Sequence, residues 1–237
     1  MRQTSRPMGM RAFVIIWIGQ IISMLGTSMT HFGLTIWIYE QTGEATPLAL
    51  MGFFFFAPMV VLSPVAGAIV DRSNRRLMMM ISDLAAGLVT IVQLALLATG
   101  SLQIWHLYVT AVISTSFQTF QWPAFSAAIA MMLSKEQYGR ANGMLELAGS
   151  AAGIFAPMLA GALLPIIGLT GIMTIDIVTF SFAVGALLFV FIPQPERTTA
   201  GRTGAGSIWK ESAYGFRHIL QRPSLLGLQL VFTVGNF

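Results

Sequence analysis

The sequence contains no cysteine among its 237 residues and has few charged side chains. Without cysteine the chain can form neither a disulfide nor a thiolate metal site, and its redox compartment is left open. Only 9% of the residues are charged and 55% are hydrophobic, whereas soluble proteins carry about 25% charged residues. This composition cannot cover a water-exposed surface, and it predicts an integral membrane protein.

The sequence also lacks the short motifs of common soluble enzymes. It has no H-E-x-x-H, no G-x-S-x-G and no P-loop. None of its three histidines has another ligand type at metal-binding spacing. The net charge is +4, but the basic residues lie in short segments between apolar runs and form no continuous face. We therefore expect no enzymatic activity, no cofactor, no metal ion and no nucleic-acid partner.

Long apolar runs dominate the chain. About 20 residues of helix cross a hydrocarbon layer of about 30 Å. We predict six transmembrane helices, at about residues 12–39, 46–70, 77–98, 103–133, 141–166 and 171–192. The first run is too long for a signal peptide and no small-residue cleavage site follows it, so we interpret it as an uncleaved span. The predicted fold class is all-α integral membrane, with a six-helix bundle over residues 1–192.

All thirteen Lys and Arg residues fall on one side of this alternating topology. They are Arg2, Arg6 and Arg11, then Arg72, Arg75 and Arg76, then Lys135 and Arg140, and finally Arg197, Arg202, Lys210, Arg217 and Arg222. The loops at 40–44, 100–101 and 167–171 carry none. The positive-inside rule then predicts a multi-pass protein of the cell (plasma or inner) membrane with a cytoplasmic amino terminus.

A short polar hinge, residues 67–76, separates the second and third runs. Asp71 lies where a helix ends, so its charge meets the negative end of the helix dipole. Arg75 and Arg76 open the next helix, where the sign is again unfavourable. Placed so poorly, these side chains are expected to have partners elsewhere. Asn74 suits a left-handed turn that reverses the chain.

The hinge pattern G-x-x-x-D-R-x-[G/N]-R-R resembles the loop between the second and third helices of the major facilitator superfamily of secondary transporters. Asn74 replaces the usual glycine. In that family the loop contacts the other half of the transporter on the cytoplasmic side. The resemblance implies a cytoplasmic gate made of Gly67, Asp71, Arg72, Arg75 and Arg76. Gly67 would let another backbone approach closely, because it has no side chain.

For the whole chain the resemblance implies the amino-terminal half of such a transporter, with two sets of three helices related as an inverted 3+3 repeat. We expect residues 193–224 to form a cytoplasmic linker with an amphipathic helix. Residues 225–237 begin an apolar run too short to span a membrane, which we interpret as a truncated seventh helix. The missing carboxy-terminal half would then be a partner of this one.

The fifth run is similar to the fifth-helix motif of family antiporters, G-x8-G-x3-G-P-x2-G-G, with three glycines replaced by alanine. The positions are Gly143, Ala152, Ala156, Pro157, Ala160 and Gly161. The resemblance favours ion-coupled efflux of a small amphipathic drug or metabolite by alternating access, as in the macrolide and siderophore efflux branch. Without a P-loop, energy would come from a proton or other ion gradient, or from the substrate's own gradient. The direction of transport stays open, and a non-transporting receptor or scaffold is the alternative.

Two polar stripes indicate a cavity between the first and fourth spans. They comprise Gln20, Ser23, Thr27 and His31, and Thr110, Ser114, Gln118 and Gln121, with Trp122 beside the second. Each stripe follows helical spacing and so lies on one face, away from lipid. We predict that both line a site for a small-molecule substrate, which would stack on Trp122. Hydrogen bonding between helices is the alternative.

Ionisable side chains inside the spans are the remaining candidates. A charge at mid-bilayer costs roughly 2.5–3.5 kcal/mol unless it is paired or protonated. We interpret Asp83 as a coupling group or as a structural ion pair with the hinge arginines, and Glu146 as a gate or coupling group. Asp176, near the outer end of its span, is interpreted as reaching the headgroups. His31 can titrate near neutral pH, although a lone histidine is more often a simple hydrogen-bonding group.

Overall fold

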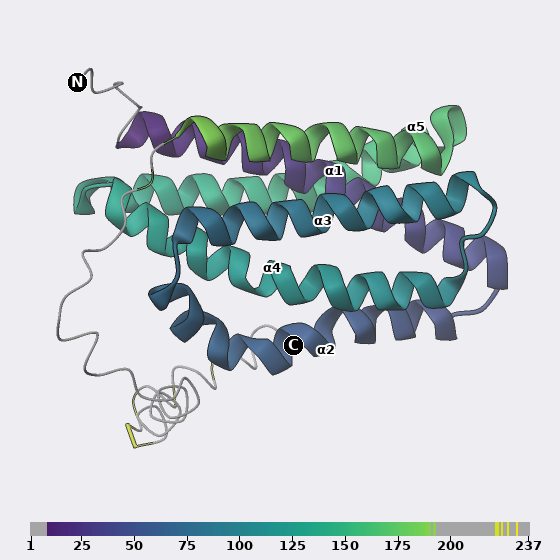
Figure 1. The fold of residues 1–237 in the computed structure, drawn as a ribbon, viewed down its shortest axis with the longest axis horizontal. Helices are drawn as coiled ribbons and strands as arrows, with labels where there is room; N and C mark the ends of the chain where they lie inside the picture. Colours follow the sequence, from purple (N-terminus) through teal and green to yellow (C-terminus); the bar gives the residue numbers. More distant parts are fainter. Residues whose placement is uncertain are drawn as a thin grey trace.

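The computed structural model describes residues 9–190, 192, 221, 222, 224, 227 and 231. The helices are α1 (Met10–Thr42), α2 (Thr46–Arg72), α3 (Arg75–Ala98), α4 (Ile104–Met132), the short 3-10 helix η1 (Lys135–Gln137) and α5 (Tyr138–Phe189). They lie along the long axis of an elongated bundle, and the described part contains no strand (Figure 1). Most of the predicted linker and seventh span lies outside the described residues.

Helix α5 is a 52-residue element with one break. At Gly168 the backbone has φ 65° and ψ 178°, a conformation that glycine adopts without the steric cost of a Cβ. The chain reverses direction there, so the two arms of α5 run in opposite directions (Figure 1). We expected a loop at 167–171, but a single non-helical residue makes the turn. A longer loop would leave backbone groups without helical partners.

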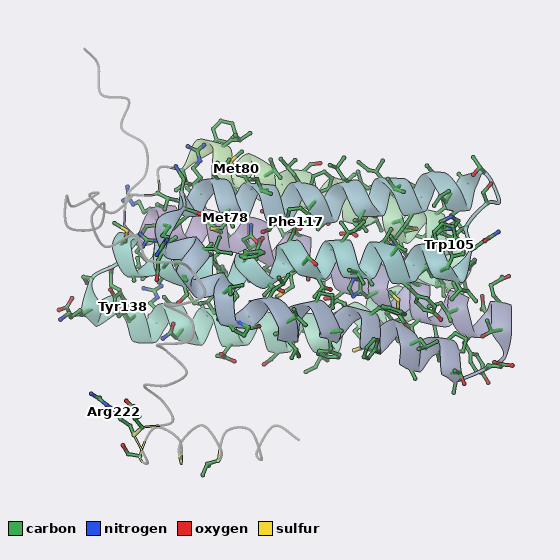
Figure 2. All side chains as sticks on the ribbon, turned by 60° about the horizontal axis from the view of Figure 1, so that its bottom comes forward. Met78, Met80, Trp105, Phe117, Tyr138 and Arg222 are labelled. Atoms are coloured by element: carbon green, nitrogen blue, oxygen red, sulfur yellow. The ribbon has the colours of Figure 1, made fainter. Side chains whose placement is uncertain are left out.

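Two core clusters mark the opposite ends of the bundle. One joins the start of α1 to the α2–α3 junction, the end of α4 and both ends of α5, through Phe13, Val70, Met79, Ile129, Ala141 and Leu187. The other gathers Leu34, Ile38, Leu102, Leu107, Leu169 and Met173. Figure 2 shows Met78, Met80 and Tyr138 toward the first end and Trp105 at the second. Every Lys and Arg of residues 9–190 therefore lies toward the end marked by the first cluster.

Helices α1, α2 and α3 and the segment Lys135–Phe189 are each long and apolar enough to cross a membrane. Helix α4, at 29 residues, is long enough but is not in this group of the described helices. Polar side chains such as Thr110, Ser114 and Thr115 lower its hydropathy, and these three are buried. Since α4 packs against α2 and α3, its polar face is turned away from lipid.

The hinge is shorter in the structure than in the sequence analysis. Helix α2 continues through Arg72 and α3 begins at Arg75, so only Ser73 and Asn74 are non-helical. Asn74 is extended, with φ −73° and ψ 111°, and its side chain accepts a hydrogen bond from the Leu77 N–H at 3.1 Å. The left-handed turn was therefore a wrong prediction. Asn74 caps α3, and capping requires an extended backbone.

We expect Asn74→Ala to destabilise the start of α3 by about 1 kcal/mol, because it removes the acceptor that caps the helix. Hydrogen exchange of the first turn of α3 should quicken about fivefold, which corresponds to that free energy. Asn142→Ala is the matched control, since Asn142 is exposed inside α5 and is not at a helix end. Unchanged exchange in the Asn74 variant would mean that packing alone holds this turn.

Candidate functional site

An open cavity of about 470 Å³ lies between the helices, with lining residues from all five α-helices. The predicted site residues on its wall are Gln20, Ser23, Thr27, His31, Asp83, Gln118, Gln121, Trp122 and Glu146. Ser114 lies on a separate, smaller cavity. Gln118 and Gln121 of the second stripe thus meet the first stripe across one space, because α1 and α4 each turn a polar face inward.

Three side chains from three helices form a hydrogen-bonded group on the cavity wall. Gln20 Nε2 on α1 donates to Asp83 Oδ2 on α3 at 2.8 Å, and Gln121 Nε2 on α4 donates to Asp83 Oδ1 at 2.7 Å. Gln121 Nε2 also donates to Gln20 Oε1 at 2.9 Å. We call Gln20, Asp83 and Gln121 the amide-carboxylate triad. It joins α1, α3 and α4 beside the cavity.

The partners of Asp83 set its chemical character. Its side chain is 7% exposed, and both of its oxygens accept from neutral amides. Amide donors offset part of the cost of a buried carboxylate but supply no positive charge. A positive charge that enters the cavity would be stabilised by a carboxylate so placed.

The hinge arginines make contacts at the end of the bundle. Arg76 donates to the backbone carbonyl of Leu188 at 2.9 Å, and Arg75 contacts the sulfur of Met131. Arg75 is buried, which fixes the start of α3 against α4. The sequence indicated that Asp83 forms an ion pair with these arginines. In the structure its hydrogen-bond partners are the amide groups of Gln20 and Gln121.

Aromatic side chains form the apolar part of the cavity wall. His31 packs edge-on against Phe55, with ring centroids 5.3 Å apart. Trp17 lines the cavity while its Nε1 donates to the Met144 carbonyl at 3.0 Å, which ties α1 to the first arm of α5. Trp122 lies on the wall and is 58% exposed. The site therefore combines flat apolar surfaces with a buried carboxylate.

Glu146 also lines the cavity, from the first arm of α5, and its side chain is exposed. Asp83, in contrast, is buried and hydrogen-bonded to amides. The two acidic groups of the cavity thus stand in different environments, one exposed within this chain and one buried among amides.

The sequence interpretation of Asp176 was wrong. Its side chain is 2% exposed and does not reach a headgroup region. Thr27 Oγ1 on α1 donates to Asp176 Oδ1 at 2.9 Å, and Thr90 Oγ1 on α3 donates to Oδ2 at 3.0 Å. The signal available in the sequence was a carboxylate between two isoleucines in an apolar run, which is costly unless partners lie on neighbouring helices.

The predicted gate residues lie at the carboxy-terminal end of α2 and at the start of α3. Apart from its two chain neighbours and the nearby backbone of its own helix, no described atom lies within 4 Å of the place where a Cβ on Gly67 would be, so its lack of a side chain serves no contact inside this part of the chain. Asp71 and Arg72 are exposed. The close backbone contact predicted for Gly67 is therefore absent among the described residues.

Curated relatives of this chain include proteins named for efflux. It is 27% identical over 229 residues to macrolide efflux protein A of Streptococcus pyogenes, covering 95% of this chain and 55% of the relative. It is 28% identical over 199 residues to macrolide efflux protein A of Enterococcus faecalis, covering 82% and 59%. An uncharacterised MFS-type transporter of Bacillus subtilis (strain 168) is 24% identical over 213 residues, covering 87% and 49%.

The chain spans about half the length of these curated relatives. Residues 16–237 match the family model described as Major Facilitator Superfamily. This range takes in the helices that line the cavity and the hinge between α2 and α3. From the all-helical apolar bundle and a family match over most of its length, we conclude that the chain belongs to the Major Facilitator Superfamily.

Proposed function

We propose that this chain forms one half of a secondary active transporter that exports a small amphipathic organic molecule across the cell membrane. The observation that carries the proposal is the 470 Å³ cavity with a buried carboxylate on its wall. Ligand sites typically enclose about 300–1,000 Å³ and combine apolar walls with a few polar groups. In the complete transporter a second half would close the other side of this space.

The walls define the class of substrate. Trp17, Phe55 and Trp122 offer apolar surface, and Asp83 offers a negative charge with neutral neighbours. A molecule with an apolar body and a cationic group satisfies both. Relatives named macrolide efflux protein support export of an organic compound, and we extend that direction of transport to this protein.

The packing of the helices supports our proposal of six membrane spans in an inverted 3+3 arrangement. The arms of α5 on either side of Gly168 would be the fifth and sixth spans. Helix α4 packs on both α2 and α3, and α1 packs on both arms of α5, through Met144 on the first and Asp176 on the second. The first and fourth spans then have equivalent neighbours, as an inverted repeat requires.

We assign the cation-rich end of the bundle to the cytoplasm by the positive-inside rule, which makes the amino terminus cytoplasmic. The hinge between α2 and α3 then faces the cytoplasm, where Gly67, Asp71 and Arg72 would contact the second half in one state of an alternating-access cycle. Their exposure in this half supports that role. Energy would come from a proton or another ion gradient, with Asp83, Glu146 and His31 as candidate coupling groups on the cavity wall.

Asp71→Asn tests the gate and the function together. In proteoliposomes holding the full-length protein, we expect gradient-driven accumulation of a fluorescent amphipathic cation, slowed about tenfold by Asp71→Asn. A tenfold loss corresponds to about 1.4 kcal/mol, a reasonable value for an ion pair made in one state only. Melting temperature should change little, because Asp71 is exposed within this half.

Glu136→Gln is the matched control, since Glu136 is an exposed carboxylate in η1 at the same end of the bundle. Its transport rate should equal that of the unmodified protein. Binding of the cation without accumulation under any imposed gradient would instead favour a receptor or scaffold. Equal rates for Asp71→Asn and Glu136→Gln would remove Asp71 from the gate.

A further inference from the structure

A second, small cavity of about 20 Å³ lies between the helices beside Asp176. Thr27, His31 and Ala86 line both this cavity and the large one. The space is large enough for one water-sized particle, since about 10–15 Å³ suffices. We call it the Asp176 cavity. It is a separate compartment next to the candidate substrate site.

Asp176 carries the negative charge of this compartment. Its oxygens accept hydrogen bonds from Thr27 on α1 and Thr90 on α3. Gly26 allows this contact, because a Cβ there would lie 3.1 Å from the Asp176 Cα. The lining holds no Lys or Arg, and His31 is its other titratable group. Hydroxyl groups stabilise the carboxylate without neutralising it.

Thr30 is a second polar group that faces this space. Its side chain is 1% exposed and lines the Asp176 cavity. The Thr30 hydroxyl lies near the Asp176 carboxylate, yet among the described residues it makes no hydrogen bond of good geometry. A buried hydroxyl without a well-formed hydrogen bond is costly, and a bound particle in the adjacent space would complete its hydrogen bonding.

The polar atoms around the space are mostly oxygens. They come from the carboxylate of Asp176 and from hydroxyl groups of Thr27, Thr30, Thr90, Thr110 and Ser114, with the Gln93 amide and the His31 ring as the other polar groups. Oxygen ligands select hard cations, and charge balance with one carboxylate selects a single positive charge. A water molecule would fill the same volume but would leave the carboxylate uncompensated.

We propose that the Asp176 cavity binds one sodium ion. The ion would neutralise Asp176 and give the Thr30 hydroxyl a partner at the same time. Because Thr27 and His31 border both cavities, occupancy would also fix the cavity-facing part of α1. Coupling of sodium to export rests on the proposed function, whereas sodium binding itself does not.

The test is equilibrium binding of radioactive sodium to the purified full-length protein, with choline as the replacement cation and no substrate present. We expect saturable binding of one ion per chain. Thr30→Val, which keeps the shape of the side chain, should weaken the affinity about tenfold, and Thr30→Ser should restore it. Asp176→Asn should abolish binding, provided that its melting curve shows a folded protein.

Thr115→Val is the matched control. Thr115 is also a buried threonine whose hydroxyl makes no hydrogen bond in the described structure, but it does not line the cavity. Its sodium affinity should not change. The proposal is overturned if the unmodified protein binds no sodium, if Thr30→Val and Thr115→Val bind alike, or if only pH and not sodium alters the melting temperature. Sodium binding without transport would contradict the proposed function alone, and transport without sodium binding would contradict this inference alone.

Discussion

Asp83→Asn should lower the export rate about a hundredfold while the protein stays folded. The variant removes the negative charge of the amide-carboxylate triad but nearly preserves its shape. Gln20 and Gln121 can rotate their amide groups to offer an acceptor to the new amide, so the contacts among α1, α3 and α4 can persist. A hundredfold loss corresponds to about 2.7 kcal/mol, in the range for a buried charge that loses its role.

The measurement is the initial rate of gradient-driven uptake into proteoliposomes, together with the melting temperature. Asp83→Glu should recover part of the rate, because it restores the charge at a slightly different position. Glu44→Gln serves as a control, since Glu44 is an exposed carboxylate beyond the end of α1. Full activity in Asp83→Asn would show that the charge has no part in binding or coupling, and that the triad only joins helices.

Gly26→Val should produce the largest loss of folded protein. A Cβ at this position would overlap the Thr179 side chain and lie 3.1 Å from the Asp176 Cα, so α1 would have to move away from the second arm of α5. Overpacking of this kind costs about 1–3 kcal/mol, and here it also separates Thr27 from Asp176. We expect a melting temperature lower by several degrees and a smaller monodisperse fraction after extraction.

Gly52→Val is the matched control. Gly52 lies inside α2, and apart from its chain neighbours and the nearby backbone of α2, no described atom lies within 4 Å of the position of a Cβ there. Both variants replace glycine by a β-branched residue inside a helix, so the change in intrinsic helix propensity is the same in both. Equal melting temperatures would mean that α1 and α5 can separate without cost, which would contradict the close packing in the structure.

Gly26 is one of three glycines on α1 that face the second arm of α5. Gly19, Gly26 and Gly33 recur along α1, and a Cβ on each would meet residues of the second arm of α5. Their partners there include Ala183, Asp176 and Leu169, respectively. Small residues repeated on one face allow close helix packing in membranes. The spacing was visible in the sequence, but the helix that it faces was not.

Helical periodicity explains why the cavity lining could be predicted. Gln20, Thr27 and His31 share one face of α1 because of the 3.6-residue repeat, and a polar face must turn away from lipid. Ser114 on α4 follows the same spacing yet lies on the Asp176 cavity. Distance along a helix axis decides which space a residue reaches, and a stripe pattern alone does not define where one cavity ends.

The partners of the buried carboxylates could not be predicted in this way. Asp83 was close in sequence to the hinge arginines, but its side chain bonds to Gln20 and Gln121 on other helices. Asp176 was placed at a membrane surface because it lies near the end of a predicted span, yet it is enclosed by α1 and α3. The free-energy cost of placing a charge inside the membrane indicated that each carboxylate needs a partner, but it did not indicate which residue the partner is.

By itself, the sequence determined that this chain is a membrane protein of long helices and that its Lys and Arg residues fall between alternate runs. Those properties depend on hydropathy and local spacing, which each segment carries independently. Only the tertiary structure decided that Asp83 joins an amide group, that Asp176 adjoins a cavity with Thr30, and that Gly168 alone turns α5. Hydrogen-bond partners and cavities arise where several helices pack together, and that packing is set by all of their surfaces at once.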